Sequence, residues 1–593
     1  PDINPLMLIR LSATYNSITY RLFYGYIESF NPGWLSERGG LGPVMRLKCV
    51  DLFKAFARMR IHPLTGTAGS HTNVAPLSAN ANSGQKLVVV TSVVGLYAGQ
   101  SVTIADDTPD TETNYIDTIN AATNTITMLN NLANNYTTAQ NAYVKKYPAV
   151  LSDIRIKDIL YEIGWPSTIG NILDNVAIDT GKVTVAEMPT SSEGINVLTH
   201  FQDVAKAESG LLFIRGDGFL VFQNRDARQT GSYATSQATF TDAGGNSHYI
   251  MPELADDETL IYNAARITPV NGTGTEQAYL DSAYIAEQGE REFNDGNSVI
   301  NTAADTIEKC ILVVERYKDS ALRCQSLLIF PDAAPVDLFP KVYNYELSTR
   351  ITLQLNSATN PAEINTQYHI EGIEHEWAVD DLWQTRWQLW DVSKFFIVPT
   401  AHDGYLEKES VISFADAHDA ANAGAVFNDN TVVAVGMNKL SGSDWFIWRG
   451  YLQINTSAIP TSVTALEALI LIRITGYFVI DTAFGITLVS GTDLANPLVV
   501  ADYGDLLNDT TSYGAVTIAT PSANDQWLII ALNAAGLAAL QAIITGGGGV
   551  MKFGLRSSLD ISNTAPAGST NRQWVSIHGF GSASPPRLFV RVA

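Results

Sequence analysis

The chain has 593 residues, of which 46% are hydrophobic and only 16% are charged, and its 37 basic and 60 acidic side chains leave a net charge of −23. This length exceeds what a single hydrophobic core supports, so we expect several domains of ordinary size. The negative charge repels phosphate backbones, which argues against specific binding of DNA or RNA.

The first predicted elements are strands in which apolar and polar residues alternate. A β-meander covers residues 9–27, and Gly25 lies inside it, where we expect a bulge or a close backbone approach. The strand Val44–Asp51 also alternates, and a short helix is predicted over Leu52–Met59.

Residues 65–146 differ from this pattern because they are rich in Gly, Ser, Thr and Asn. Strands are predicted at Lys86–Thr91, Ser101–Ala105, Asn114–Ile119 and Thr125–Met128. We interpret the segment as a small β-domain inserted into the first domain, since insertions of this kind are tolerated at a protein surface.

Two helices and a hairpin are predicted next. Asp153–Ile163 and Asn196–Glu208 each carry an apolar stripe at helical spacing. Ser209-Gly210 ends the second helix, and the hairpin Leu211–Phe222 turns at Gly216-Asp217-Gly218. This mixture of helices and strands predicts an α/β element.

A second β-rich region is predicted from Glu258 onward. It begins with the strand Leu260–Ile267, and a helix over Thr302–Tyr317 has an apolar face. The strands Gln325–Phe330 and Tyr345–Leu355 follow. They lead to the strongest pattern in the chain, an alternating hairpin over Tyr368–Trp390 with an acidic turn at Asp380-Asp381.

The order of these elements resembles the hub domains of tailed-phage tail proteins. The motif F-x-G-x-I matches Phe23–Ile27, and D-G-x-L-x-F matches Asp217–Phe222. Asp281–Arg291 resembles a third motif of the family, with its serine and tyrosine displaced or missing. A Gly-Ile-x-His strand at Gly372–His375 precedes a strand rich in Trp and Thr, as it does in that family.

The resemblance implies two related hub-type β-barrels with an α/β element between them, assembled as a threefold ring at the virion tail tip or baseplate. It implies a homotrimer that contacts distal tail, tube and tip proteins and lets DNA pass through an acidic lumen. On this basis we assign 1–64 to the first part of barrel I, 65–146 to the inserted domain, 147–235 to the rest of barrel I and the α/β element, and 236–400 to barrel II.

Residues 401–593 predict a further β-rich domain after a polar linker. Its motif R-G-x-L-x-I-N-T-S-x-I-P, at Arg449–Pro460, and the strands Ala465–Ile474, Val550–Arg556 and Arg587–Val592 resemble a carbohydrate-binding-module-like β-sandwich. The usual pattern has Asp where this chain has Asn455, so we do not expect this turn to bind calcium. The fold class predicted for the whole chain is therefore mainly β and multidomain.

Aromatic side chains of this last domain are the candidate ligand contacts, because sugar rings stack on exposed Trp and Tyr. Along Trp445–Ile454 we expect Phe446, Trp448, Leu452 and Ile454 to face the core and the opposite face to be exposed. A host-surface polysaccharide or a neighbouring tail protein would then bind there. The alternative is that these rings pack the sandwich. The candidate glycan contacts are Trp445, Arg449, Tyr451, Tyr503 and Tyr513.

The sequence contains no motif that nominates a catalytic residue, a metal site or a cofactor. His369, Glu371 and His375 would share one face of a strand, but no H-E-x-x-H pattern is present and we expect polar pairing across the sheet instead. Gly546–Gly549 lacks the Lys-Ser/Thr of a phosphate-binding loop. The three cysteines have no C-x-x-C spacing, so we expect neither structural zinc nor disulfides.

Two other functions remain open at this point. One is a secreted polysaccharide-binding or polysaccharide-degrading protein with an appended binding module, and the other is a non-phage adhesin anchored to a cell surface. We expect no membrane segment, since no apolar run approaches the roughly 20 residues that cross a bilayer. We also expect no signal peptide, and because the chain begins at Pro1 without Met, we expect residues upstream of it to have been removed or left out.

Overall fold

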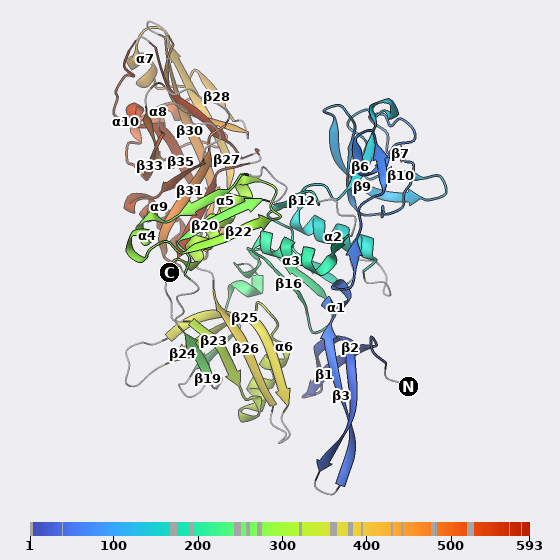
Figure 1. Ribbon diagram of the computed structural model, residues 1–593. Coiled ribbons are helices and arrows are strands. Elements are labelled where there is room, and N and C mark those ends of the chain that lie inside the picture. Colours follow the sequence, from blue (N-terminus) through green and yellow to red (C-terminus); the bar gives the residue numbers. More distant parts are fainter. Residues whose placement is uncertain are drawn as a thin grey trace. The chain divides into compact units, whose positions relative to one another are not determined.

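The computed structural model is mainly β and multidomain (Figure 1). The chain divides into two compact units, unit 1 (Pro1–Val392) and unit 2 (Ser393–Ala593). Unit 2 therefore begins before residue 401, where we expected the last domain to start. The structure describes residues 4–592 apart from 38–39, 166–174, 189–193, 230, 242–250, 256–260, 270–274, 320–322, 356–363, 378–382, 393–394, 429–430, 441–443, 462, 476–480, 482, 519–526, 569, 581 and 583.

Unit 1 opens with a three-stranded antiparallel sheet in the order β1-β2-β3, followed by a short helix. Its elements are β1 (Leu8–Tyr15), β2 (Ile18–Glu37), β3 (Gly40–Asp51) and α1 (Phe53–Phe56). The close backbone approach predicted at Gly25 is confirmed, because a Cβ there would lie 2.1 Å from the carbonyl oxygen of Val50. No larger residue fits between these two strands at this point.

The segment between Gly66 and Lys146 forms a seven-stranded sheet in the order β5-β6-β11-β8-β9-β10-β7. It has a hydrophobic core of its own, which includes the fully buried Val88, Val102, Ile104 and Ile126. The strands are β5 (Gly66–Ala68), β6 (His71–Pro76), β7 (Leu87–Val89), β8 (Ser101–Ala105), β9 (Thr111–Asn120), β10 (Thr125–Met128) and β11 (Tyr143–Lys146).

The α/β element follows, and both predicted helices are confirmed as α2 (Ser152–Ile163) and α3 (Val197–Glu208). The side chain of Asn196 accepts a hydrogen bond from Thr199 N–H and so caps α3, which ends at Ser209 in the left-handed conformation. The predicted hairpin is β16 (Leu211–Ile214) and β17 (Leu220–Gln223), with β13 (Val176–Ile178) parallel to β17. Short strands complete this part: β4 (Arg60–Ile61), β12 (Val150–Leu151), β14 (Thr184–Val185) and β15 (Ile195–Asn196).

The rest of unit 1 contains two sheets. A six-stranded sheet has the order β18-β24-β25-β26-β23-β19, and a three-stranded sheet has the order β21-β20-β22 and contacts α5. The predicted hairpin is confirmed as β25 and β26, while its turn at Asp380-Asp381 lies outside the described residues. The elements are β18 (Ala238–Thr241), β19 (Met251–Ala255), β20 (Ala264–Pro269), β21 (Gln277–Leu280), α4 (Ser282–Gln288), β22 (Glu292–Ser298), α5 (Ala303–Tyr317), β23 (Arg323–Ile329), α6 (Pro335–Asn344), β24 (Arg350–Leu355), β25 (Ile364–Trp377) and β26 (Trp383–Asp391).

The turn of the β16–β17 hairpin lies directly against β2. A Cβ at Gly216 would come 2.5 Å from the carbonyl oxygen of Arg21, and a Cβ at Gly218 would come 2.4 Å from the ring of Tyr24. Gly218 also has a φ of +94°, a conformation that side chains disfavour. Gly216 N–H donates a hydrogen bond to the carboxylate of Glu346 at 3.1 Å. The hairpin turn therefore connects the first sheet to the segment that precedes β24.

Aromatic rings on α6 extend the same set of contacts. The ring of Tyr343 lies 5.6 Å from that of Tyr20 on β2 and 5.1 Å from that of Trp383 on β26. It also meets the ring of His375 on β25, at 6.4 Å. Three motifs that lie far apart in the sequence, on β2, at the β16–β17 turn and on β25, are thus linked through α6 and its neighbours.

Unit 2 is a β-sandwich in which β27 (Phe395–Ser410) belongs to both layers. Residues Phe395–Pro399 pair with β37, and Thr400–Ser410 pair with β30. Side chains from both layers, among them Ile470, Leu588, Leu452 and Phe553, share one core. The other strands are β28 (Ala425–Phe427), β29 (Val432–Lys439), β30 (Trp445–Asn455), β31 (Ala465–Arg473), β32 (Phe484–Ser490), β33 (Gly514–Ile518), β34 (Trp527–Ala531), β35 (Val550–Ser557), β36 (Asn571–His578) and β37 (Arg587–Val592), and the helices are α7 (Phe414–His418), α8 (Asp502–Asn508), α9 (Ala534–Thr545) and α10 (Ser558–Ile561).

A buried carboxylate joins the inserted sheet to α2. Asp158 accepts hydrogen bonds from the N–H of Ser101, at 2.8 Å, and from its hydroxyl. Burial raises the pKa of Asp158 to about 7, although the hydrogen bonds from Ser101 act in the opposite direction. The native state therefore holds a proton that the unfolded chain releases near pH 4.

This raised pKa predicts that unit 1 loses stability as the pH rises. The stabilising contribution of the bound proton is fully present below pH 3.8 and disappears as the pH passes through about 7. We expect Asp158→Asn, which imitates the protonated form, to raise stability at pH 8 by roughly 2–4 kcal/mol relative to the wild type and to have little effect at pH 4. Calorimetric unfolding at both pH values measures this. Asp117→Asn, at an exposed position on β9, is the control, and an equal effect of the two substitutions would contradict the prediction.

Candidate functional site

Four of the five predicted glycan contacts are buried, so the prediction that they face solvent is wrong. Arg449 and Tyr503 are 0% exposed, Tyr451 is 1% exposed and Trp445 is 8% exposed. Segments that include α7, α8 and α10 cover their side of β30, where the rings form a second core with Leu406, Met437 and Leu506. A strand that is covered on both sides has apolar residues on both faces, and the segment WFIWRGYLQI is apolar at most of its positions.

Tyr513, the fifth predicted contact, is half-buried. It packs against the main core of the sandwich, and its ring lies 6.5 Å from that of Phe553. Contact between Tyr513 and a glycan stays a prediction.

Arg449 has a structural role at the centre of this second core. Its guanidinium donates two hydrogen bonds to the carboxylate of Asp560, at 2.8 and 3.0 Å, and two more to the carbonyl oxygens of His418 and Tyr503. Arg556 donates to the same carboxylate at 2.6 Å. Although burial raises the pKa of Asp560, the attraction of the two arginines lowers it to about 2. These hydrogen bonds attach α7, α8 and α10 to the sheet.

The other face of the same sheet carries a row of aromatic and acidic side chains that we call the aromatic face. Strand register places Glu407 opposite Trp448, Glu409 opposite Phe446, and Tyr405 opposite Phe427. On β36, Trp574 follows in the same row, because Gly436 of β29 pairs with both tryptophans. The aromatic face consists of Tyr405, Glu407, Glu409, Phe427, Phe446, Trp448 and Trp574.

The rings of the aromatic face form two groups. Tyr405 and Phe427 are stacked with centroids 4.5 Å apart, whereas Trp448 lies 5.7 Å from Phe446 and 4.8 Å from Trp574. A Cβ at Gly436, whose φ is +126°, would come 2.5 Å from the Cα of Trp574. The glycine therefore allows the two indoles to meet across β29.

This geometry suits a ligand that has both flat apolar surfaces and hydroxyl groups. The rings of Tyr405, Phe427, Phe446 and Trp574 are half-buried, and Glu409 is exposed. Glu407 accepts a hydrogen bond from Trp448 Nε1 at 2.7 Å, which fixes the carboxylate beside the indole. Rings of this kind combine apolar area with a polar edge, and carboxylates accept hydrogen bonds from hydroxyl groups.

Sequence reasoning missed this site because it assigned Phe446 and Trp448 to the core together with Leu452 and Ile454. That assignment is confirmed for Leu452 and Ile454, which lie in the core of the sandwich, and Trp448 is also buried, but Phe446 is half-exposed. The signal that was available is the alternation of Tyr405, Glu407 and Glu409 in the preceding strand.

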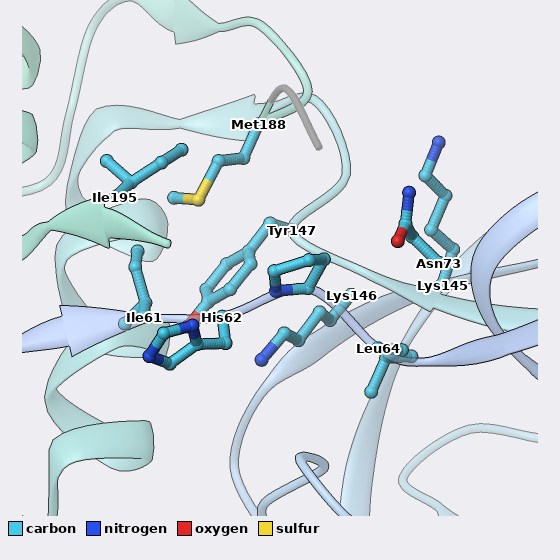
Figure 2. Close-up of a pocket in the computed structure, with 10 residues that line it drawn as sticks. Ile61, His62, Leu64, Asn73, Lys145, Lys146, Tyr147, Met188 and Ile195 are labelled. Carbon is cyan, nitrogen blue, oxygen red and sulfur yellow. The ribbon is translucent and has the colours of Figure 1, made fainter. Parts of the chain in front are cut away.

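Unit 1 contains a small hollow between the inserted sheet and the α/β element, lined by His62, Lys145, Lys146 and Tyr147 among others (Figure 2). Lys146 forms an ion pair with Glu162 at 2.8 Å, and Tyr147 donates a hydrogen bond to the same carboxylate. Lys145 forms an ion pair with Glu187. Carboxylates of the protein thus neutralise the positive charges of both lysines. The hollow therefore gives no indication of an anionic ligand.

The histidines considered as metal ligands form other contacts. His369 Nε2 lies 3.3 Å from the carbonyl oxygen of Tyr233, and Glu371 pairs with Arg228. His375 meets Thr385 across the sheet at 3.0 Å, which confirms the predicted polar pairing for this residue. Within the described ranges, no group of three His, Cys, Asp or Glu side chains is arranged to hold a metal ion. The helices of those ranges include none long and apolar enough to span a membrane.

Comparison with known proteins gives remote structural similarities alone, since no family model and no curated protein matches the chain. The tail protein from Neisseria meningitidis MC58 is 10% identical with a TM-score of 0.30, and the alignment covers 52% of this chain and 96% of that protein. The 43 kDa tail protein of prophage MuSo2 from Shewanella oneidensis is 10% identical with a TM-score of 0.28, covering 55% and 96%. A chain of the virion of a native gene transfer agent particle is 13% identical with a TM-score of 0.26, covering 41% and 48%. At these TM-scores the similarities assign neither a fold nor a function to this chain.

The Asp560 cluster predicts a large loss of stability when its carboxylate is removed. Asp560→Asn leaves two buried guanidinium groups without their counter-charge, so we expect unit 2 to lose about 3–5 kcal/mol. The control is Asp481→Asn, which removes a solvent-exposed partner of Arg572, at 3.3 Å, and is expected to cost less than about 1 kcal/mol. Scanning calorimetry resolves the transition of unit 2. If the two variants lowered the unfolding temperature of unit 2 equally, the Asp560 cluster would not be what holds the helices in place.

Proposed function

We propose that the chain is a structural protein of a phage tail tip, where three copies form a hub that joins the tail tube to the tip and lets DNA pass. The observation that carries the proposal is the meeting of three hub-like motifs in unit 1. The strand containing Gly25, the turn containing Gly218 and the strand containing His375 are connected through close glycine contacts and the rings of α6. The collinear sequence motifs are thus part of one packed arrangement.

Charge supports the passage of DNA without its retention. The chain carries a net charge of −23, so a channel wall built from it would repel the phosphate backbone. Retention of DNA by counterion release requires Lys and Arg side chains at the phosphates, and an acidic channel wall would not supply them. This proposal requires no enzymatic activity.

We further propose that unit 2 binds a host-surface polysaccharide through the aromatic face, with a neighbouring tail protein as the other candidate partner. The paired rings and the carboxylates of Glu407 and Glu409 support this assignment. The alternative function is a secreted polysaccharide-binding or polysaccharide-degrading protein. The same face would bind the polysaccharide in that case, but the chain would not be part of a particle.

Electron microscopy of particles tests the structural role. We expect gold-labelled antibodies against unit 2 to bind at the distal end of purified tails. Cells in which the gene is disrupted are expected to yield no complete, infectious or injecting particles. A chain that is missing from purified particles and accumulates free in the medium would instead support the secreted binder.

Substitution of the aromatic face tests the binding role. We expect Phe446→Ala and Trp574→Ala each to weaken binding of purified host envelope polysaccharide about tenfold, equivalent to about 1.4 kcal/mol. Trp527→Ala is the control because Trp527 is also half-buried but lies on β34, outside the aromatic face. Isothermal titration calorimetry measures the affinities. An unchanged affinity in both variants would show that the polysaccharide binds outside the aromatic face or is not a ligand of this chain.

A further inference from the structure

The aromatic face of unit 2 adjoins a polar side chain, that of Asn438 on β29. Strand register places Phe446 of β30 between Glu409 of β27 and Asn438. Asn438 is two residues from Gly436, the position over which the two indoles of the aromatic face meet. Because side chains two residues apart on a strand point to the same side of a sheet, Asn438 lies on the side of the aromatic face.

The side-chain amide of Asn438 is buried beside a ring that is only half-buried. Asn438 is 8% exposed, and its Oδ1 atom has no hydrogen-bond partner in the part of the chain that the structure describes. A buried acceptor without a partner destabilises the folded state, so such atoms call for an explanation. The terminal torsion of an asparagine is broad, and no hydrogen bond at Oδ1 opposes a rotation that turns the oxygen toward the surface.

A missing partner does not by itself indicate a ligand, as Gln573 of β36 shows. Gln573 is 2% exposed, and its Oε1 atom likewise has no partner among the described residues. Gln573 pairs with Met437, which belongs to the second core on the side that the helices cover. Asn438 differs from Gln573 because it lies on the opposite side of the sheet, next to the half-buried ring of Phe446.

Charge limits the ligand that this part of the sheet accepts. The carboxylates of Glu407 and Glu409 would repel an acidic sugar. At the other end of the row, Arg572 lies opposite Asn438, and its charge is balanced by an ion pair with Asp481 at 3.3 Å. These groups favour an uncharged ligand, whose hydroxyl groups can donate hydrogen bonds to the carboxylates.

An acceptor next to an apolar ring complements a group that carries a donor next to a methyl group. An acetamido group has this composition, since its N–H donates a hydrogen bond and its methyl group packs against a ring. A hydroxyl group supplies the donor without the methyl group. The pair Asn438 and Phe446 therefore suits a sugar that bears an acetamido group better than one that bears a hydroxyl group at the same carbon.

We propose that the aromatic face binds uncharged, N-acetylated amino sugars. Asn438 Oδ1 accepts a hydrogen bond from the acetamido N–H, and the ring of Phe446 packs against the acetamido methyl group. The inference rests on the proposed function, because it assumes that unit 2 binds a polysaccharide. A backbone amide of a neighbouring tail protein also offers an N–H, but the carboxylates of Glu407 and Glu409 favour a ligand rich in hydroxyl groups.

The test compares oligosaccharides of equal length and linkage that differ only in the acetamido group. Isothermal titration calorimetry of the full chain measures N-acetylglucosamine against glucose oligomers, and N-acetylgalactosamine against galactose oligomers. We expect the wild type to bind at least one acetylated oligomer about tenfold more tightly than its hydroxyl counterpart. Asn438→Leu is expected to remove this preference and to leave the affinity for the counterpart unchanged.

Asn438→Leu is also expected to leave the unfolding temperature of unit 2 unchanged or raised, because no hydrogen bond to Oδ1 within the protein is lost. Gln573→Leu is the matched control, since it removes an equally unpartnered amide from the other side of the sheet. We expect the control to bind every oligomer as the wild type does. Scanning calorimetry of both variants separates a loss of binding from a loss of folding.

The possible failures are distinguishable. A wild type that binds acetylated and hydroxyl oligomers equally, or an Asn438→Leu variant that keeps the preference, overturns this inference and leaves polysaccharide binding in place. A wild type that binds none of the oligomers overturns the inference together with the proposed binding role. Binding of a purified tail protein that Asn438→Leu abolishes would overturn it in favour of a protein partner. The location of the chain in particles is measured independently of all these outcomes.

Discussion

The buried carboxylate of Asp560 allows one face of the sheet in unit 2 to be covered by helices. It balances two guanidinium groups in the interior, and those groups bind carbonyl oxygens at α7 and α8. Burying the two guanidinium groups without this counter-ion would cost about 3–5 kcal/mol. With it, one face of β30 becomes core. On the other face, Leu452 and Ile454 belong to the core of the sandwich, and the aromatic face occupies only the part near Phe446 and Trp448. The aromatic face of unit 2 combines flat rings with carboxylates, which favours a neutral, hydroxyl-rich ligand.

Unit 1 depends on a different constraint, namely the space that glycine leaves at close backbone approaches. Gly25, Gly216 and Gly218 each lie where a Cβ would come within 2.5 Å of a neighbouring atom. These three positions bring β2, the β16–β17 turn and the segment before β24 into contact. Gly25 and Gly218, which lie in two of the motifs that resemble hub domains, thus have a physical function in the packing of this chain.

The sequence by itself determined the elements whose signals are local. The alternation along Tyr368–Trp390 predicted the β25–β26 hairpin, and Asn196 and Ser209 marked the ends of α3. The helix α6 was missed because Pro335 and Pro340 interrupt its pattern, although Pro335 lies in the first turn, where proline is tolerated.

Only the tertiary structure decided what covers each face of β30. Alternation separates Arg449 from Trp448 but does not say what packs against either side chain. Arg449 is buried because Asp560, 111 residues later, lies on a helix too short to be recognised from its sequence. A strand's own residues specify its two faces, but burial depends on distant residues that the chain brings together only when it folds.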